Sequence, residues 1–258
     1  MKEFLGFGGY QRSAEGYLSW QHLSFVSGLM AVMILLAVWF GLKNRKKPLH
    51  RRNAPLMVAA ILIDAFEIFK ILMMCLRAKD PMGWTTELPL FLCSIQLITI
   101  PLAAFCHGRA KEAALDFVCI FGIIGAILGT YGAGQNYNCY PVLSMDNVVS
   151  GITHSISGFC SLYIMISGLA SMKKRNIWIT FAILLSFCGV AYITNLLIDY
   201  NYMFLMAGDG TPYDILYNLV GGSPVWYPIG VVGLFILYIF GFYAVVNLIR
   251  HKKRACVG

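Results

Sequence analysis

Among the residues of this sequence that could do chemistry, Glu67, Cys93 and His154 lie inside long apolar stretches. Each belongs to a different stretch, and the order of the stretches places all three in the outward-facing half of a membrane. Ionisable and reactive groups in hydrocarbon are costly and mark functional sites. A thiol becomes a nucleophile when a neighbouring base takes its proton. Because Cys93 and His154 have the same expected depth, they form a candidate nucleophile and general base, provided that their helices are neighbours.

Seven apolar stretches position these residues. The chain has 258 residues, 59% hydrophobic and 12% charged, whereas soluble domains carry about 25% charged residues, so a water-soluble globule is excluded. Each stretch comes near or above the roughly 20 residues that cross about 30 Å of hydrocarbon as a helix. Backbone groups in lipid must be satisfied within the segment, which requires helices. The sequence predicts an all-α polytopic membrane protein, a single domain over 1–258, with helices at 23–42, 54–77, 87–106, 113–133, 147–170, 177–199 and 224–249.

The placement of basic residues orients these predicted helices. Basic residues concentrate on the cytoplasmic side of membrane proteins, and here they follow the first, third, fifth and seventh stretches. We therefore expect the N-terminus outside and the C-terminus in the cytoplasm. The net charge of +8 then faces anionic lipid and does not indicate nucleic-acid binding. The residues concerned are Lys43, Arg45, Lys46, Lys47, Arg51, Arg52, Arg109, Lys111, Lys173, Lys174, Arg175, Arg250, Lys252, Lys253 and Arg254.

Charged neighbours on the second stretch have several interpretations. Glu67 and Lys70 are three residues apart on one helix face and can pair with each other, which lets two charges survive in the membrane. Alternatively, Glu67 orients His154, or Lys70 holds an anionic lipid headgroup. Asp64 on the same face leaves the group with net negative charge, so a further partner or a proton is required.

Other polar residues extend the candidate site. Gln96 lies three residues after Cys93 on the same predicted face and could donate a hydrogen bond to an oxyanion. His22 and Asn195, near the outer ends of their helices, complete a polar ring. The cysteines are scattered without pair spacing, so no metal site, disulfide framework or cofactor is predicted.

Small residues recur at spacings of three and four on the fourth and fifth stretches, which lets helix backbones approach closely. His154 lies in the middle of such a face and is therefore expected to point into the bundle. The residues of the two faces are Gly122, Gly125, Gly129 and Gly132, and Gly151, His154, Gly158 and Ser161.

Two motifs resemble a known family. Residues 88–94 read Leu-Pro-Leu-Phe-Leu-Cys-Ser, and residues 201–205 read Asn-Tyr-Met-Phe-Leu. With these motifs the chain resembles, over most of its length, the bacterial YwaF-like integral membrane proteins, which are grouped with the eukaryotic transmembrane protein 164 family. Further matching positions are His22, Glu67, His154, Pro224, Trp226 and Tyr227.

The resemblance implies a membrane-embedded acyl-transfer or lipid-ester enzyme in which a Cys or Thr on one helix is paired with a His on another. Cys93 would be the nucleophile and His154 the base, and Asn201 and Tyr202 would support the site. Phe91 stands where the family has a His. Residues two apart do not face each other on a helix, so the loss of that His leaves the pair intact.

These observations predict an acyltransferase or lipid-ester hydrolase near the outer leaflet of a bacterial plasma membrane, with a phospholipid or other acyl lipid as its partner. The sequence leaves the oligomeric state open. The alternative is a transporter or lipid-binding protein whose polar cavity is lined by Asp64, Glu67, Lys70 and His154. A seven-helix receptor is a third possibility. A retinal pigment is disfavoured because 224–249 contains no lysine for a Schiff base.

Overall fold

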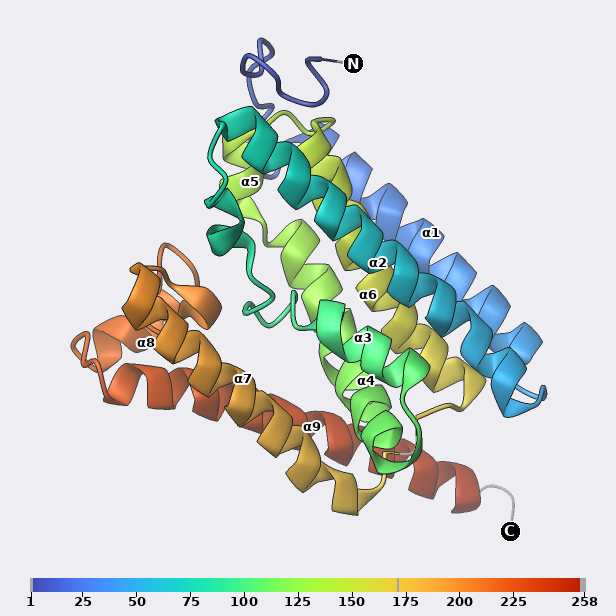
Figure 1. Cartoon of the computed structure of the whole chain (residues 1–258). Coiled ribbons are helices and arrows are strands. Elements are labelled where there is room, and N and C mark those ends of the chain that lie inside the picture. The colour runs from blue at the N-terminus through green and yellow to red at the C-terminus, as the bar shows by residue number, and fades with distance from the viewer. Residues whose placement is uncertain (1, 171, 256–258) are drawn as a thin grey trace. The chain divides into compact units, whose positions relative to one another are not determined.

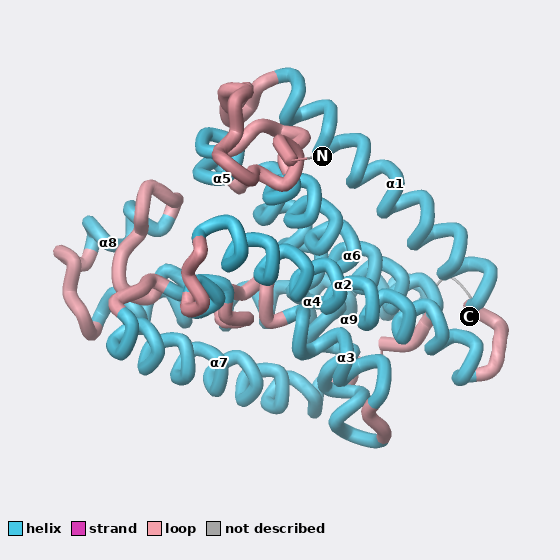
Figure 2. The backbone as a smooth tube through the Cα atoms, turned by 45° about the horizontal axis from the view of Figure 1, so that its top comes forward, coloured by secondary structure: helices cyan, strands magenta, loops and turns pink. Residues whose placement is uncertain are grey.

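A computed structural model describes the backbone of residues 2–170 and 172–255, with side chains up to residue 249. Regular structure throughout this part of the chain is helical (Figures 1 and 2). The chain divides into two compact units, Met1–Ala170 and Ser171–Gly258. The basic residues predicted after the last helix (Arg250, Lys252, Lys253 and Arg254) lie outside the residues whose side chains are described.

The first unit is built around two central helices, α4 and α6, which make its most extensive helix–helix contact. The glycine and serine positions permit this close approach: a Cβ at Gly122 would lie 2.7 Å from the Ser157 carbonyl oxygen, and Ser161 Oγ donates a 2.6 Å hydrogen bond to the Cys119 carbonyl. The prediction that the glycines serve helix packing is confirmed at Gly122 and at Gly158, where an added Cβ would lie 2.7 Å from Ala126 Cβ. The elements are α1 (Trp20–Asn44), α2 (Leu49–Ala78), η1 (Gly83–Glu87), α3 (Gln96–Phe105), α4 (Gly108–Tyr131), α5 (Gly134–Cys139) and α6 (Met145–Ser167).

The second unit contains two long helices joined by a structured loop. Phe181 packs edge-on against Phe240 at 5.0 Å between ring centroids, which fixes α7 against α9. Its elements are η2 (Lys174–Asn176), α7 (Ile177–Ile198), η3 (Tyr202–Phe204), α8 (Tyr213–Leu219) and α9 (Trp226–Ala255).

Five helices in the described residues are long and apolar enough to cross a membrane: Trp20–Asn44, Gly108–Cys139, Met145–Ser167, Lys174–Ile198 and Trp226–Ile249. They coincide with the first, fourth, fifth, sixth and seventh predicted spans. The second span is covered by α2, whose 30 residues include several charged side chains. The all-α prediction is confirmed, whereas the count of seven spans, the placement of the termini and the single domain stay predictions.

The third predicted span differs most from the structure. The sequence predicts a helix over 87–106, but helix α3 begins only at Gln96 and is ten residues long. Pro89 disfavours helical geometry at the residue before it. Ser94 then holds a turn, because its Oγ accepts from the Phe91 N–H at 2.9 Å and donates to the Phe91 carbonyl at 3.1 Å. Such local bonds compete with the helix, so Cys93 lies on a turn that leads into α3.

Candidate functional site

The structure brings Cys93 and His154 together within the first unit. The thiol of Cys93, on the turn before α3, lies within hydrogen-bonding reach of the His154 ring in the middle of α6. Both side chains are partly buried, so they are shielded but remain accessible. The two residues are 61 positions apart in the sequence, and helix packing alone places them in contact.

Helix α4 determines where the two side chains lie, through Gly125 and Gly129. A Cβ at Gly129 would stand 2.7 Å from His154 Cγ and closer still to Cδ2 and Nε2, so the ring rests directly on this glycine. One turn earlier, a Cβ at Gly125 would lie 3.5 Å from Cys93 Cα and Cβ, which is ordinary contact. The i and i+4 positions share one helix face, and this face seats the imidazole and the thiol side by side.

The hydrogen bonds of His154 fix its tautomer. Nδ1 lies 2.7 Å from the carbonyl oxygen of Ser150, one turn earlier on α6. A carbonyl only accepts, so Nδ1 carries the proton and Nε2 keeps its lone pair. The Ser150 carbonyl thus orients the ring as a carboxylate does in a catalytic triad. Nε2 is therefore the nitrogen that can accept the thiol proton.

Two backbone groups near the sulfur could stabilise negative charge, and a buried amide lies at the start of α3. The backbone N–H groups of Cys93 and Ser94 act on the sulfur atom through hydrogen bonds. Gln96 is fully buried; its Oε1 accepts from Thr99 Oγ1 at 3.2 Å, whereas its Nε2 has no hydrogen-bond partner among the described residues. A buried donor without a partner costs free energy. This donor is consequently available to a ligand.

Lys70 is held between two carboxylates. Its Nζ lies 2.7 Å from Glu67 Oε1 and 2.9 Å from Glu87 Oε2, and its charge acts on His154 electrostatically. The predicted Glu67–Lys70 ion pair is present. Glu67 therefore pairs with Lys70, and the Ser150 carbonyl is the group that orients His154. Lys70 is engaged by two carboxylates of the protein. Asp64 Oδ1 is buried without a hydrogen-bond partner among the described residues.

His22 has a structural role. The Leu18 N–H donates to its Nδ1 at 3.1 Å, so Nε2 carries the proton and bonds the Thr130 carbonyl at 3.1 Å. The ring packs on Tyr137 with 3.9 Å between centroids. Because both nitrogens are engaged, neither is available for proton transfer.

Asn195, Asn201 and Tyr202 lie in the second unit, where they organise the loop after α7. Asn195 Nδ2 donates to the Tyr202 carbonyl at 3.1 Å, and the Tyr202 N–H donates to Asn195 Oδ1 at 2.7 Å. Asn201 Oδ1 accepts from the Met206 N–H at 2.8 Å. These bonds hold Met203 in left-handed geometry at φ +57°. The Asn-Tyr-Met-Phe-Leu motif therefore specifies a loop that side-chain hydrogen bonds to the backbone hold in one conformation.

Sequence reasoning missed two residues of the site. Glu87 is predicted only as the first residue of a helix, although it supplies the second partner of Lys70. Ser150 belongs to no predicted motif; its position four residues before His154 is the signal that could identify it, since a side chain can bond the carbonyl one turn earlier.

The helical architecture, with five long apolar helices in the described residues, is that of a multi-pass helical membrane protein. A family model described as the TMEM164 family matches residues 17–244. The chain therefore belongs to the TMEM164 family, which confirms the resemblance to the transmembrane protein 164 family. No curated protein and no solved structure matches the chain.

Proposed function

We propose that the protein is a membrane-embedded acyltransferase or lipid-ester hydrolase with Cys93 as nucleophile and His154 as general base. The observation that carries the proposal is the contact between the Cys93 thiol and a ring whose Nδ1 proton is bound by the Ser150 carbonyl at 2.7 Å. A nucleophile, its base and an orienting group are the three parts of nucleophilic catalysis. The substrate is a phospholipid or other acyl lipid of the outer leaflet of a bacterial plasma membrane.

The first half-reaction transfers the acyl group to the enzyme. His154 Nε2 takes the thiol proton, and the sulfur attacks the carbonyl carbon of the lipid ester, which forms a C–S bond. The carbonyl oxygen becomes an oxyanion, to which the backbone N–H groups of Cys93 and Ser94 and the Nε2 of Gln96 can donate. The C–O ester bond then breaks, and the leaving alkoxide takes the proton from His154.

The second half-reaction regenerates the thiol. A hydroxyl or amine of an acceptor, or water, loses its proton to His154 Nε2 and attacks the thioester carbonyl. The C–S bond breaks, and the sulfur recovers the proton. Water gives hydrolysis and a lipid acceptor gives transfer, so the acceptor alone distinguishes the two activities.

The Glu67–Lys70–Glu87 group supports this site without entering the reaction. Lys70 ties α2 to η1 through two short ion pairs, and η1 leads directly into the segment that carries Cys93. The ion pairs thereby hold the nucleophile's turn against the bundle. Pairing of this kind also makes buried charges tolerable in an apolar environment.

The experiment uses the full-length protein in vesicles that contain a phospholipid labelled in one acyl chain and an unlabelled lysophospholipid. We expect the label to move to the lysophospholipid or to appear as free fatty acid. Cys93→Ala should reduce this rate by at least about 100-fold, since covalent catalysis is lost. Cys75→Ala is the matched control and should keep wild-type activity. Full activity of a folded Cys93→Ala variant would exclude the mechanism.

A transporter or lipid-binding function is the second candidate, and the unpartnered buried Oδ1 of Asp64 favours it. It predicts the opposite pattern of effects, because a polar cavity depends on charge and not on a thiol. Glu67→Gln would then abolish the movement of lipid across the membrane, while Cys93→Ala would leave it unchanged.

A further inference from the structure

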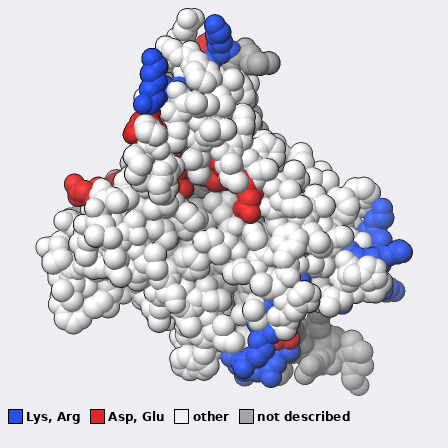
Figure 3. Space-filling model, in the orientation of Figure 1, with Lys and Arg blue, Asp and Glu red and all other residues white. Residues whose placement is uncertain are grey.

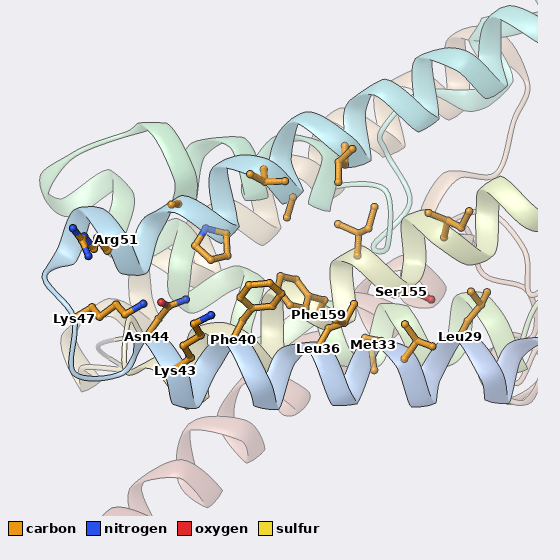
Figure 4. Close-up of a pocket in the computed structure, with 18 residues that line it drawn as sticks. Leu29, Met33, Leu36, Phe40, Lys43, Asn44, Lys47, Arg51, Ser155 and Phe159 are labelled. Atoms are coloured by element: carbon orange, nitrogen blue, oxygen red, sulfur yellow. The ribbon is translucent and has the colours of Figure 1, made fainter.

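A long apolar groove runs between α1 and α2, with α6 as its floor (Figure 4). Its volume is about 720 Å³, within the range of small-molecule sites. Helices α1 and α2 contact each other little and both pack on α6, so they leave the groove open between them. Leu36 and Phe40 of α1 and Phe159 of α6 line its middle part.

The dimensions of the groove match an acyl chain that lies along a helix. Its lining on α1 extends from Leu29 to Asn44, which is about 22 Å at about 1.5 Å per residue. One leaflet of hydrocarbon is about 15 Å deep, half of the bilayer core. The groove therefore reaches from headgroup level to beyond the depth of a single leaflet.

One end of the groove is basic. Lys43, Lys47 and Arg51 line it where α1 connects to α2, and none of them forms an ion pair in the described part of the chain. In Figure 3, which has the orientation of Figure 1, blue side chains gather at this connection and at other places on the same face. Lys43 Nζ also lies over the ring of Trp39, 5.0 Å from its centroid. Three cations without a carboxylate partner in the described residues, at the end of an apolar channel, complement an anionic headgroup.

The groove is distinct from the Cys93–His154 site. The residues of α6 that line the groove are Ile152, Ser155, Ile156 and Phe159, which follow the i, i+3, i+4, i+7 spacing of one helix face. His154 is two residues from Ile152 and Ile156, so it does not share their face. Its ring instead rests on Gly129 of α4. Helix α6 thus separates the two sites.

We propose that this groove holds one anionic glycerophospholipid of the cytoplasmic leaflet. Its phosphate contacts Lys43, Lys47 and Arg51, and one acyl chain lies between α1 and α2. The lipid fills the space that the two helices leave open, and it is bound on the opposite face of α6 from the proposed nucleophile. The inference does not depend on the acyl-transfer proposal.

The test is native mass spectrometry of the full-length protein titrated with phosphatidylglycerol or with phosphatidylcholine of the same acyl chains. We expect phosphatidylglycerol to bind more tightly. Lys43→Gln combined with Arg51→Gln should weaken this binding about 25-fold, since each basic residue contributes about fivefold near an anionic lipid. Arg45→Gln combined with Lys46→Gln is the matched control: it removes the same charge from the same segment, but neither residue lines the groove.

A second variant tests the apolar part. Val58 lines the groove and is 56% exposed, so Val58→Trp fills the channel without disturbing the core and should abolish the tight adduct. Equal binding of the two lipids, an unchanged adduct in Val58→Trp, or an equal loss in the Arg45/Lys46 control would each overturn the proposal. Displacement of the lipid by millimolar inorganic phosphate would also overturn it, because the site would then recognise a free anion. The Cys93→Ala variant should bind phosphatidylglycerol as the wild type does.

Discussion

Gly129→Ala should disable the Cys93–His154 pair although it removes no functional group. The His154 ring rests on the Gly129 backbone, and an added Cβ would stand 2.7 Å from Cγ and nearer to two other ring atoms. Ordinary contact begins at 3.4 Å, so the ring must move by about 1 Å or more. A displacement of about 1 Å between reacting groups costs about 100-fold in rate.

Gly125→Ala is the matched comparison on the same face of α4. Its Cβ would lie 3.5 Å from Cys93 Cα and Cβ, which requires no movement. Both substitutions replace glycine by alanine within a helix and gain about 0.5–1 kcal/mol of helix propensity. Only Gly129→Ala also overpacks the site, which costs about 1–3 kcal/mol.

The assay is the rate at which an activated acyl ester, such as p-nitrophenyl butyrate, acylates Cys93, measured by intact mass. Thermal unfolding of each variant shows whether it is folded. We expect Gly125→Ala to react within about threefold of the wild type and Gly129→Ala to react about 100-fold more slowly. Equal rates in the two folded variants would refute the argument that Gly129 seats the histidine beside the thiol.

Three further predictions concern stability. Asp146→Asn should lower the unfolding free energy by about 2–3 kcal/mol in chemical denaturation, because it leaves the guanidinium of Arg77 without the carboxylate that accepts two 2.7 Å bonds. The pKa of Tyr10 is raised from 10.0 to about 12, mainly by burial and then by the hydrogen bond to Asp146. The neutral phenol therefore contributes its full stabilisation of the fold below pH 10. This contribution is lost as the pH rises towards 12. Tyr10→Phe should flatten that part of the profile of melting temperature against pH, and an unchanged slope would contradict the assignment. Asn195→Ala should cost about 1–3 kcal/mol and speed proteolysis of the loop after α7, because it removes both bonds to the Tyr202 backbone; unchanged protease sensitivity would contradict this role.

The sequence identifies the helical architecture because hydrocarbon leaves a long apolar segment few alternatives. It also predicts the Glu67–Lys70 pair, since an i, i+3 spacing on a helix brings two side chains together whatever the tertiary fold. Equal depth of Cys93 and His154 predicts a contact, but that depth for Cys93 assumes a helix over 87–106, whereas the structure has a turn at Cys93. What places the thiol beside the ring is the glycine face of α4.

The remaining features depend on tertiary structure. The segment 88–95 is apolar enough to predict a helix. Pro89 and the hydrogen bonds between Ser94 and Phe91 instead favour a turn there. Glu87 reaches Lys70 from another element, a contact that no local pattern encodes. The groove between α1 and α2 likewise results from how these helices pack on α6, and their sequences alone show only apolar residues followed by basic ones.

The most direct measurement is the intact mass of the purified full-length protein after incubation with membrane phospholipid, followed by peptide mapping. We predict an acyl adduct on Cys93 that is absent from Cys93→Ala and lost in His154→Ala. The cysteines that lie away from any histidine, such as Cys160, should stay unmodified. An adduct of equal yield in His154→Ala, or acyl transfer by the wild type with no adduct on Cys93, would contradict a nucleophile and base formed by these two residues.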